Sequence, residues 1–214
     1  MNIKHLLRKL RLNGKEFITD LDLKEYCSLF ELTYADTVAY LLRKKYLIRI
    51  FRGIFYVRSV EEVILGRSKY SHFQLVARGL ELKKIENWYF GLHTALKLNN
   101  MTHEYFAIED VLSDTLFRAA PISIAGHKFR FTKISSSLMD FGILKDRGIR
   151  FSDPEKTILD FIYIWRYRGL PHARIVEDVS EWADTLNTSR FRRYSRNYPQ
   201  TVVNITEEVI HVKR

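Results

Sequence analysis

The segment 33–57, TYADTVAYLLRKKYLIRIFRGIFYV, constrains the fold most, because a helical pattern is followed directly by an alternating one. Thr33 with Asp36 three residues later predicts a helix start with a shortened capping box. After Tyr46, two short runs rich in β-branched and aromatic residues flank Gly53 and predict two strands joined by a tight turn. The segment therefore predicts a helix followed by a β-hairpin.

The predicted helix has two faces. Val38, Leu41, Leu42 and Lys45 recur at helical spacing and predict the side that packs. A second stripe at i, i+4, i+7 and i+11 is expected to face outward, where its hydroxyl and amino groups would contact base edges in a DNA major groove. Arginines on the hairpin would reach phosphates or the adjacent minor groove. The candidate DNA-binding residues are Thr33, Thr37, Tyr40, Arg43, Lys44, Arg49 and Arg52.

The helix and hairpin alone fit an ordinary amphipathic helix with solvated cations as well as they fit DNA binding, and the residues before this segment favour DNA binding. Residues 3–12 predict a helix that ends at Asn13-Gly14, Phe17-Ile18 a very short strand, and residues 22–30 a second helix. On the second helix Cys27 shares an apolar face and is expected to be a core residue. Three helices followed by a hairpin are typical of a winged helix-turn-helix.

The predicted fold class is α+β, with two domains. Residues 1–58 are expected to form a winged helix-turn-helix DNA-binding domain, and residues 59–214 a larger mixed α/β domain. Net charge is +10, and residues 1–58 contribute +6 of it, with 12 Lys and Arg against 6 Asp and Glu. This basic excess favours a polyanionic partner, for which double-stranded DNA is our prediction.

The larger domain is predicted to contain both helices and strands. Helices are expected at 58–66, 70–84, 88–100, 153–166, 172–184, 188–197 and, weakly, 201–212. Strands are expected at 105–109, 121–124, 128–134 and 149–151, with a turn at Gly126-His127. Asp153-Pro154-Glu155 has proline at the first helical position and carboxylates near the positive end of the helix dipole.

Composition and motifs argue against several functions. A single cysteine allows no intrachain disulfide, no apolar run has membrane-spanning length, and the start is too polar for a signal peptide, so we expect a cytoplasmic protein with no membrane partner. The seven histidines lack metal-ligand spacing, and no glycine-rich phosphate cradle occurs. We therefore predict no metal, no cofactor, no catalytic residues and no enzymatic activity.

Two sets of residues allow both a functional and a purely structural interpretation. Asp153, Glu155 and Lys156 suggest a nuclease-like set, but a helix cap explains them better because the two carboxylates do not face together on a helix. A second basic cluster combines arginine with Phe191, Tyr194 and Tyr198. It suits a nucleic-acid surface, an acidic protein partner, or a solvated helix face equally well. Its basic members are Arg190, Arg192, Arg193 and Arg196.

Three stretches make the chain resemble the AbiEi family of antitoxins and transcriptional regulators from abortive-infection loci, which act in antiviral defence. They are LIRIFRGIFYV, WYFGLHTALKLNNMTHE and IRFSDPEKTILDFIY, and in this order they cover most of residues 30–165. Family members usually have a glycine just after the third helix, and here Tyr46 fills that position. The part after about residue 170 matches no family stretch.

The resemblance implies a division of labour between the two domains. The N-terminal domain would repress its own toxin-antitoxin operon by binding operator repeats. The C-terminal domain would counteract a nucleotidyltransferase-like toxin, in the type IV manner, without an obligatory stable complex. The alternative is a ligand-responsive winged-helix transcriptional regulator outside toxin-antitoxin systems, with an apolar pocket in the C-terminal domain.

Overall fold

The computed structural model describes residues 2–212 and combines helices with two β-sheets in that range, so the predicted α+β class is confirmed. The chain folds into two compact units. The first unit comprises Met1–Lys84 and Ser123–His127, and the second comprises Ile85–Ile122 and Lys128–Arg214.

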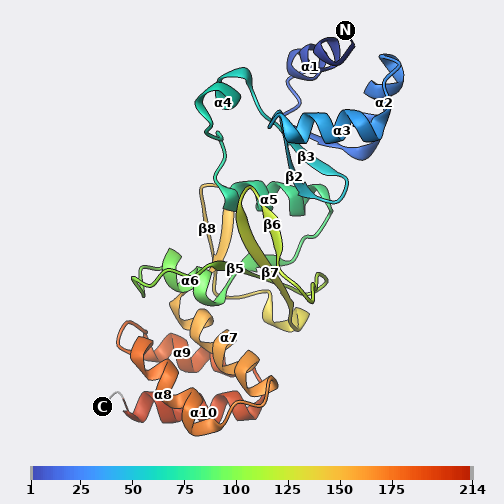
Figure 1. Cartoon of the computed structure of the whole chain (residues 1–214). Coiled ribbons are helices and arrows are strands. Elements are labelled where there is room, and N and C mark those ends of the chain that lie inside the picture. Colours follow the sequence, from blue (N-terminus) through green and yellow to red (C-terminus); the bar gives the residue numbers. More distant parts are fainter. Residues whose placement is uncertain (1, 213–214) are drawn as a thin grey trace. The chain divides into compact units, whose positions relative to one another are not determined.

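The first unit contains the elements that the organising segment predicts (Figure 1). The elements are α1 (Asn2–Leu12), β1 (Phe17–Thr19), α2 (Asp20–Leu29), α3 (Tyr34–Arg43), β2 (Leu47–Phe51), β3 (Ile54–Val57), α4 (Val60–Leu65) and α5 (His72–Leu82). The strands form an antiparallel sheet in the order β1-β3-β2. Leu6, Leu10, Leu23, Cys27 and Leu41 are buried in one core, which confirms Cys27 as a core residue.

The predicted domain boundary after residue 58 lies inside the first unit. Arg58 donates hydrogen bonds to the carbonyls of Glu62 and Arg67, which hold the α4 segment against the end of β3. Farther along, Lys69 pairs with Glu16 at 2.6 Å. α5 packs on the hairpin so closely that a Cβ at Gly79 would lie 2.5 Å from the Ile50 side chain. These contacts explain why α4 and α5 cluster with the first unit.

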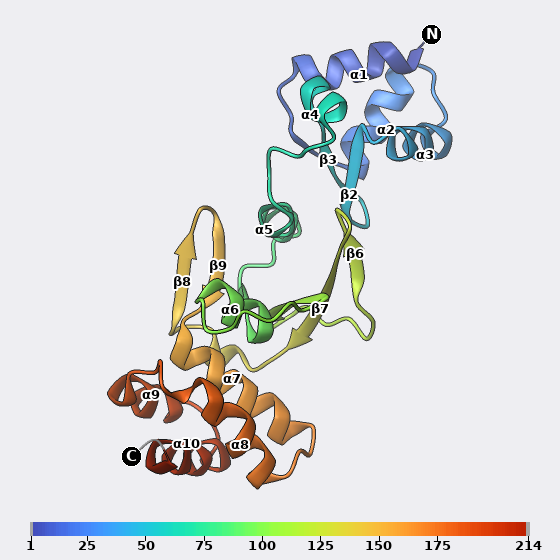
Figure 2. The same ribbon diagram turned by 60° about the vertical axis from the view of Figure 1, so that its left-hand side comes forward.

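The second sheet is six-stranded, in the order β6-β7-β5-β4-β9-β8, and most of it belongs to the second unit (Figure 2). Most of β6 and the first residue of β7 lie in Ser123–His127, which belongs to the first unit. The strands are β4 (Trp88–Phe90), β5 (Ile108–Ser113), β6 (Ile122–Ile124), β7 (His127–Lys133), β8 (Ile143–Asp146) and β9 (Ile149–Ser152). The helices are α6 (Leu92–Leu98), α7 (Pro154–Tyr167), α8 (His172–Ala183), α9 (Thr188–Ser195) and α10 (Gln200–Val212). The C-terminal helix, which the sequence indicates only weakly, is confirmed.

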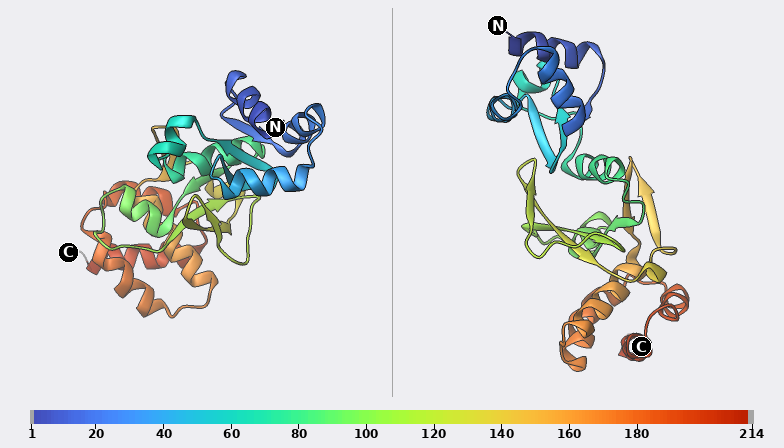
Figure 3. Two further views of the ribbon diagram at one scale, coloured as in Figure 1. Left: turned by 45° about the horizontal axis from the view of Figure 1, so that its top comes forward. Right: turned by 90° about the vertical axis from the view of Figure 1, so that its right-hand side faces the viewer.

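Four helices form the C-terminal part of this unit, where α7 contacts α8, α9 and α10 (Figure 3). Their buried faces share one core with α6. Large apolar side chains fill that core, among them Leu96, Ile158, Phe161, Ile175, Phe191, Val202 and Ile205. α7 has apolar residues on several sides, so it must be covered from several directions. The sheet and the helices accordingly share one interior.

Three strands of the structure differ from the prediction. Residues 88–90 were expected within a helix but form β4, because the extended backbone at Gly91 and the positive φ of 49° at Leu92 separate them from α6. The strand predicted at 105–109 lies at 108–113 instead. β8 was not predicted, since its residues are mostly exposed and only pairing with β9 makes them a strand.

Candidate nucleic-acid interface and buried polar network

α3 begins after Thr33, but the Thr33 side chain makes no capping hydrogen bond, so the predicted capping box at this site is wrong. The complete capping box belongs to α2, where Thr19 and Asp22 exchange side-chain and backbone bonds. At the other end, Lys45 has a φ of 58°, and the Tyr46 amide donates to the carbonyl of Leu41 at 2.9 Å. The left-handed residue that ends α3 is therefore Lys45, and not Tyr46.

The outward stripe of α3 is only partly as predicted. Thr37 is 2% exposed and shares a hydrogen bond with the Cys27 thiol, whose pKa burial raises. Its hydroxyl is therefore not available to DNA bases, and the prediction for Thr37 is wrong. Tyr40 is half-buried beneath the Arg43 guanidinium, 5.9 Å from the ring centre. The exposed positions on α3 and its ends are Thr33, Ala35, Asp36, Ala39, Arg43, Lys44 and Lys45.

The hairpin extends this surface with two exposed arginines. Arg49 lies over the Phe55 ring at 5.6 Å, and Arg52 occupies the turn beside Gly53. With Arg43, Lys44 and Lys45 they make five exposed cations, which we call the basic face. Lys45 was predicted on the packing side of the helix, and this is wrong because α3 ends before it and its left-handed backbone leaves the side chain exposed. None of the five forms an ion pair with another residue in the described range 2–212. Each therefore keeps its charge available for an external anion.

Gly53 fixes the tip of the hairpin. Its φ is +77°, and a Cβ there would lie 2.9 Å from the Asp20 carboxylate. Its carbonyl accepts a hydrogen bond from the Asp20 amide at 2.9 Å, which ties the hairpin to the start of α2. The same Asp20 carboxylate accepts a hydrogen bond from the Tyr34 hydroxyl on α3. Burial, reinforced by this bond, raises the pKa of Tyr34 to about 12.

We expect Gly53→Val to cost the first unit about 1 to 2 kcal/mol from backbone strain alone, with a further loss from the Asp20 contact, and to weaken DNA binding. Gly148→Val is the control, since Gly148 has a φ of +80° in the β8–β9 turn but open space around it. Urea unfolding and DNA titration measure both effects. Equal DNA affinities for the two variants would show that the hairpin does not contribute to DNA binding.

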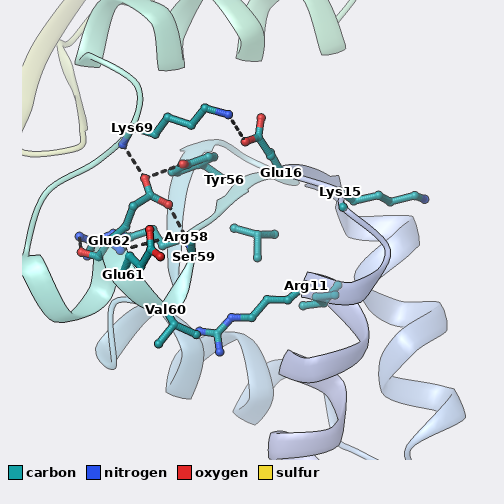
Figure 4. A pocket seen from close by; sticks show the side chains of 13 residues that line it. Arg11, Lys15, Glu16, Tyr56, Arg58, Ser59, Val60, Glu61, Glu62 and Lys69 are labelled. Carbon is teal, nitrogen blue, oxygen red and sulfur yellow. Dashed lines mark hydrogen bonds and ion pairs between the residues drawn. The ribbon is translucent and has the colours of Figure 1, made fainter.

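A groove of about 710 Å³ lies behind the hairpin, between α1, β3 and α4 (Figure 4). Arg58 is buried there, and among the described residues its hydrogen bonds go to the backbone carbonyls of Lys45, Glu62 and Arg67. Burial opposes ionisation of Glu62, yet hydrogen bonds from Tyr56 and from the amides of Lys69 and Ser59 hold its pKa below the usual value. These side chains are occupied in fixing α4.

The DPEKTILD segment forms the start of α7 and a buried polar network in the second unit. The Asp153 carboxylate caps the helix by accepting from the Lys156 amide at 2.8 Å, which confirms the predicted cap. Lys156 itself is fully buried. Its ammonium lies 3.4 Å from Asp160 and 4.5 Å from the centre of the Phe141 ring. Burial lowers the pKa of Lys156, and Asp160 opposes that effect.

Asp160 joins three parts of the second unit. The hydroxyl of Tyr89 on β4 donates to one carboxylate oxygen at 2.8 Å, and that of Tyr198, just before α10, donates to the other at 2.7 Å. Burial and the nearby carboxylate raise the pKa of both phenols well above the usual value. The network therefore connects the sheet, α7 and the C-terminal helices. Lys156 and Asp160 are four residues apart, one turn of α7, whereas the two tyrosine partners are distant in the sequence and no local pattern connects them to Asp160.

The residues of the nuclease hypothesis have separate partners. Lys156 binds Asp160, Asp153 caps α7, and the Glu155 carboxylate accepts from the Asn187 amide at 2.8 Å and pairs with Arg190 at 3.3 Å. They are not arranged around a common open site.

The arginines of the second basic cluster also differ in their partners. Arg192 forms two hydrogen bonds with the Glu207 carboxylate, at 2.7 and 2.6 Å, and Arg190 is paired with Glu155. Only Arg193 and Arg196 remain exposed without an ion pair to a described residue. The arginines at 190 and 192 thus hold α9 to its neighbours, and a partner surface would rest on the other two.

A further polar cluster was not identified from the sequence. Asp110 on β5 is 1% exposed, and its carboxylate accepts from Arg130 at 2.7 Å and lies 3.3 Å from the His93 ring nitrogen. The three residues come from β5, β7 and α6, more than 15 positions apart, so no local pattern connects them. The Arg130 guanidinium is the ion-pair partner of the buried Asp110 carboxylate.

The comparisons with known proteins establish a fold likeness. No protein-family model matches the chain, and no curated protein matches it significantly. The crystal structure of the RV2827C protein from Mycobacterium tuberculosis is similar, with a TM-score of 0.60 over 96% of this chain and 74% of that one, at 14% identity. At this identity the likeness concerns the fold alone. Within residues 2–212, the helices are too short or too polar to cross a lipid bilayer.

Proposed function

We propose that this protein is a DNA-binding antitoxin that represses its own operon and counteracts a nucleotidyltransferase-like toxin. In this proposal residues 1–58 form a winged helix-turn-helix, with α3 as the recognition helix and β2–β3 as the wing. The supporting observation is the basic face: Arg43, Lys44, Lys45, Arg49 and Arg52 are exposed and unpaired within the described range. Cations on a helix and an adjacent hairpin are the groups that contact DNA phosphates and base edges.

The exposed residues of α3 suggest which contacts read sequence. Ala39 and Arg43 are one turn apart on the outward side, with Asp36 one turn before Ala39. Arginine in the major groove binds guanine with two hydrogen bonds, and a small residue beside it allows close approach. We assign base reading to Arg43, phosphate contacts to Lys44, Lys45 and Arg52, and minor-groove or phosphate contact to Arg49.

The toxin-directed activity is assigned to the second unit and rests on the AbiEi resemblance. Two of the three resembling stretches lie in this unit, and they provide β4, α6, β9 and α7. Their polar residues, including Tyr89 and Asp160, bond to one another inside the fold, which favours a rigid binding scaffold over a catalytic site. We accordingly propose a cytoplasmic, non-enzymatic protein that uses no cofactor.

Alanine substitutions distinguish base reading from phosphate contact. Arg43→Ala is expected to lower the ratio of operator to random-DNA affinity by roughly 5- to 150-fold, since one bidentate base contact is worth about 1 to 3 kcal/mol of discrimination. Arg52→Ala is expected to weaken binding to both DNAs equally. Competition titrations with the protein's own promoter and random DNA measure the ratio of the two affinities for each variant. If Arg43→Ala lowers both affinities alike, α3 does not read bases at this position.

A further inference from the structure

α4 carries four apolar side chains and two glutamates and buries none of its residues. It has only six residues, VEEVIL, although a capping box at Ser59 and a left-handed Gly66 define its ends. Isolated helices of this length are marginal in water, and most helices gain their stability by packing an apolar face. Yet Ile64 is 76% exposed and Leu65 is 70% exposed. The helix is therefore locally well specified but lacks a surface that covers it.

The exposed face of α4 combines apolar and acidic side chains. Val60, Glu61, Ile64 and Leu65 share one side of the helix and are all exposed, whereas Glu62 and Val63 are turned toward the unit. Glu62 is occupied by Tyr56, and Glu61 forms no ion pair with a described residue. This face would suit a groove with an apolar floor and a basic rim.

Such a groove lies beside α4 on the same chain. It has a volume of about 470 Å³, and its lining residues are Lys4, Leu7, Arg8, Arg11, Leu12, Tyr46 and Val60. Leu12 is 73% exposed at its end, and Figure 4 shows the Arg11 side chain beside Val60. Lys4, Arg8 and Arg11 form no ion pairs with described residues, and the lining contains no acid.

We propose that a second copy of this chain covers the α1–α4 face, by which we mean Lys4, Arg8, Leu12, Glu61, Ile64 and Leu65. The α4 of each copy would lie in the basic groove of the other, and the groove and the helix are adjacent, so the contact closes as a two-fold symmetric dimer. Ile64 and Leu65 enter the apolar floor, and Glu61 pairs with Arg8 of the second copy. Opposite charges that are unpaired within one chain become paired between two.

The basic face used for DNA is made of other residues, on α3 and the hairpin, so the dimer does not depend on the proposed function. A dimer would place two basic faces on one particle. Operator binding would then involve two half-sites with a fixed spacing. The association itself is measurable without DNA.

Sedimentation equilibrium of the full chain, from about 1 to 100 µM, tests the proposal. We expect the mass to rise from 25.5 kDa toward twice that value. Ile64→Asp or Leu65→Asp should raise the dimer dissociation constant at least 30-fold, as expected for a central interface residue. These positions are exposed, so folding should be unchanged. Leu21→Asp, at an equally exposed position on α2, is the matched control.

Charge exchange tests the register of the two copies. Arg8→Glu and Glu61→Lys should each weaken the dimer, and the double variant should restore it to within a few-fold of the wild type. A chain that stays monomeric at 100 µM overturns the proposal and leaves the face to a different kind of partner. Equal effects of Ile64→Asp and Leu21→Asp, or no restoration in the double variant, would also contradict it.

Discussion

Lys156→Ala is expected to destabilise the second unit by about 3 to 5 kcal/mol, because it leaves the buried carboxylate of Asp160 without its cation. The ammonium is fully buried, 3.4 Å from that carboxylate and enclosed by the rings of Phe141, Tyr89 and Tyr198. Truncation therefore also leaves a cavity among close-packed rings, which adds to the loss. Urea unfolding followed by tryptophan fluorescence measures it.

Lys145→Ala, at an exposed position on β8 in the same unit, is the control and should change stability by no more than about 0.5 kcal/mol. Asp160→Ala should resemble Lys156→Ala, and the double variant should cost much less than the sum of the two, because the residues act as one pair. Additive losses would mean that Lys156 and Asp160 do not act as a pair. A loss below about 1 kcal/mol for Lys156→Ala would mean that the network does not support the fold.

The same pair predicts a dependence on pH. Burial holds the pKa of Lys156 below the ordinary value of 10.5, so between the two the unfolded chain binds more protons and stability rises with pH. In Asp160→Asn, the attraction that raises this pKa is removed. The folded pKa then falls further, and the rise in stability begins at lower pH than in the wild type. Parallel stability curves for the two proteins between about pH 7 and 10 would contradict this assignment.

The second large effect concerns the basic face. The triple variant Arg43→Ala, Arg49→Ala, Arg52→Ala is expected to lose roughly 10²- to 10³-fold in DNA affinity at 0.1 M salt. The wild-type affinity should fall with salt with a log–log slope of about −4 to −7, and each lost phosphate contact reduces that slope by about 0.9. Fluorescence anisotropy with promoter DNA between about 50 and 300 mM salt gives both quantities.

Arg193→Ala with Arg196→Ala is the comparison, because these are the exposed arginines of the second basic cluster that form no ion pair with a described residue, and the variant removes two cations where the triple variant removes three. It should leave the affinity within about two-fold of the wild type and reduce the slope by less than one unit. An unchanged slope in the triple variant would show that the basic face does not contact DNA. A larger loss of DNA affinity in the Arg193→Ala, Arg196→Ala variant would show that the DNA interface lies in the second unit.

Local patterns predicted the elements of the first 58 residues well. Asp153 was identified as a cap because its partner is only three residues away, and the β2–β3 turn because Gly53 interrupts two β-rich runs. Thr37 was misassigned because it lies at the edge of two overlapping helical stripes. Only the folded chain brings the Cys27 thiol to its hydroxyl and buries it.

Features that depend on contacts between residues distant in the sequence could not be predicted from local patterns. Trp88 to Phe90 are buried on both sides, so their continuous apolar run has no strand period and was interpreted as part of a helix. The partners of Asp160 come from β4 and from the residues before α10, and Arg130 reaches Asp110 across neighbouring strands. Arg190 and Arg192 looked available because their acidic partners lie 35 and 15 residues away.

We propose that DNA binding resides in the basic face and toxin neutralisation in the second unit. The most direct measurement is a co-expression assay in cells with a nucleotidyltransferase-like toxin and a promoter reporter, at matched protein levels. The wild type should repress the reporter and restore growth. The triple arginine variant should lose repression and still restore growth fully. Loss of growth rescue in that variant, or absence of rescue by the wild type, would contradict the claim.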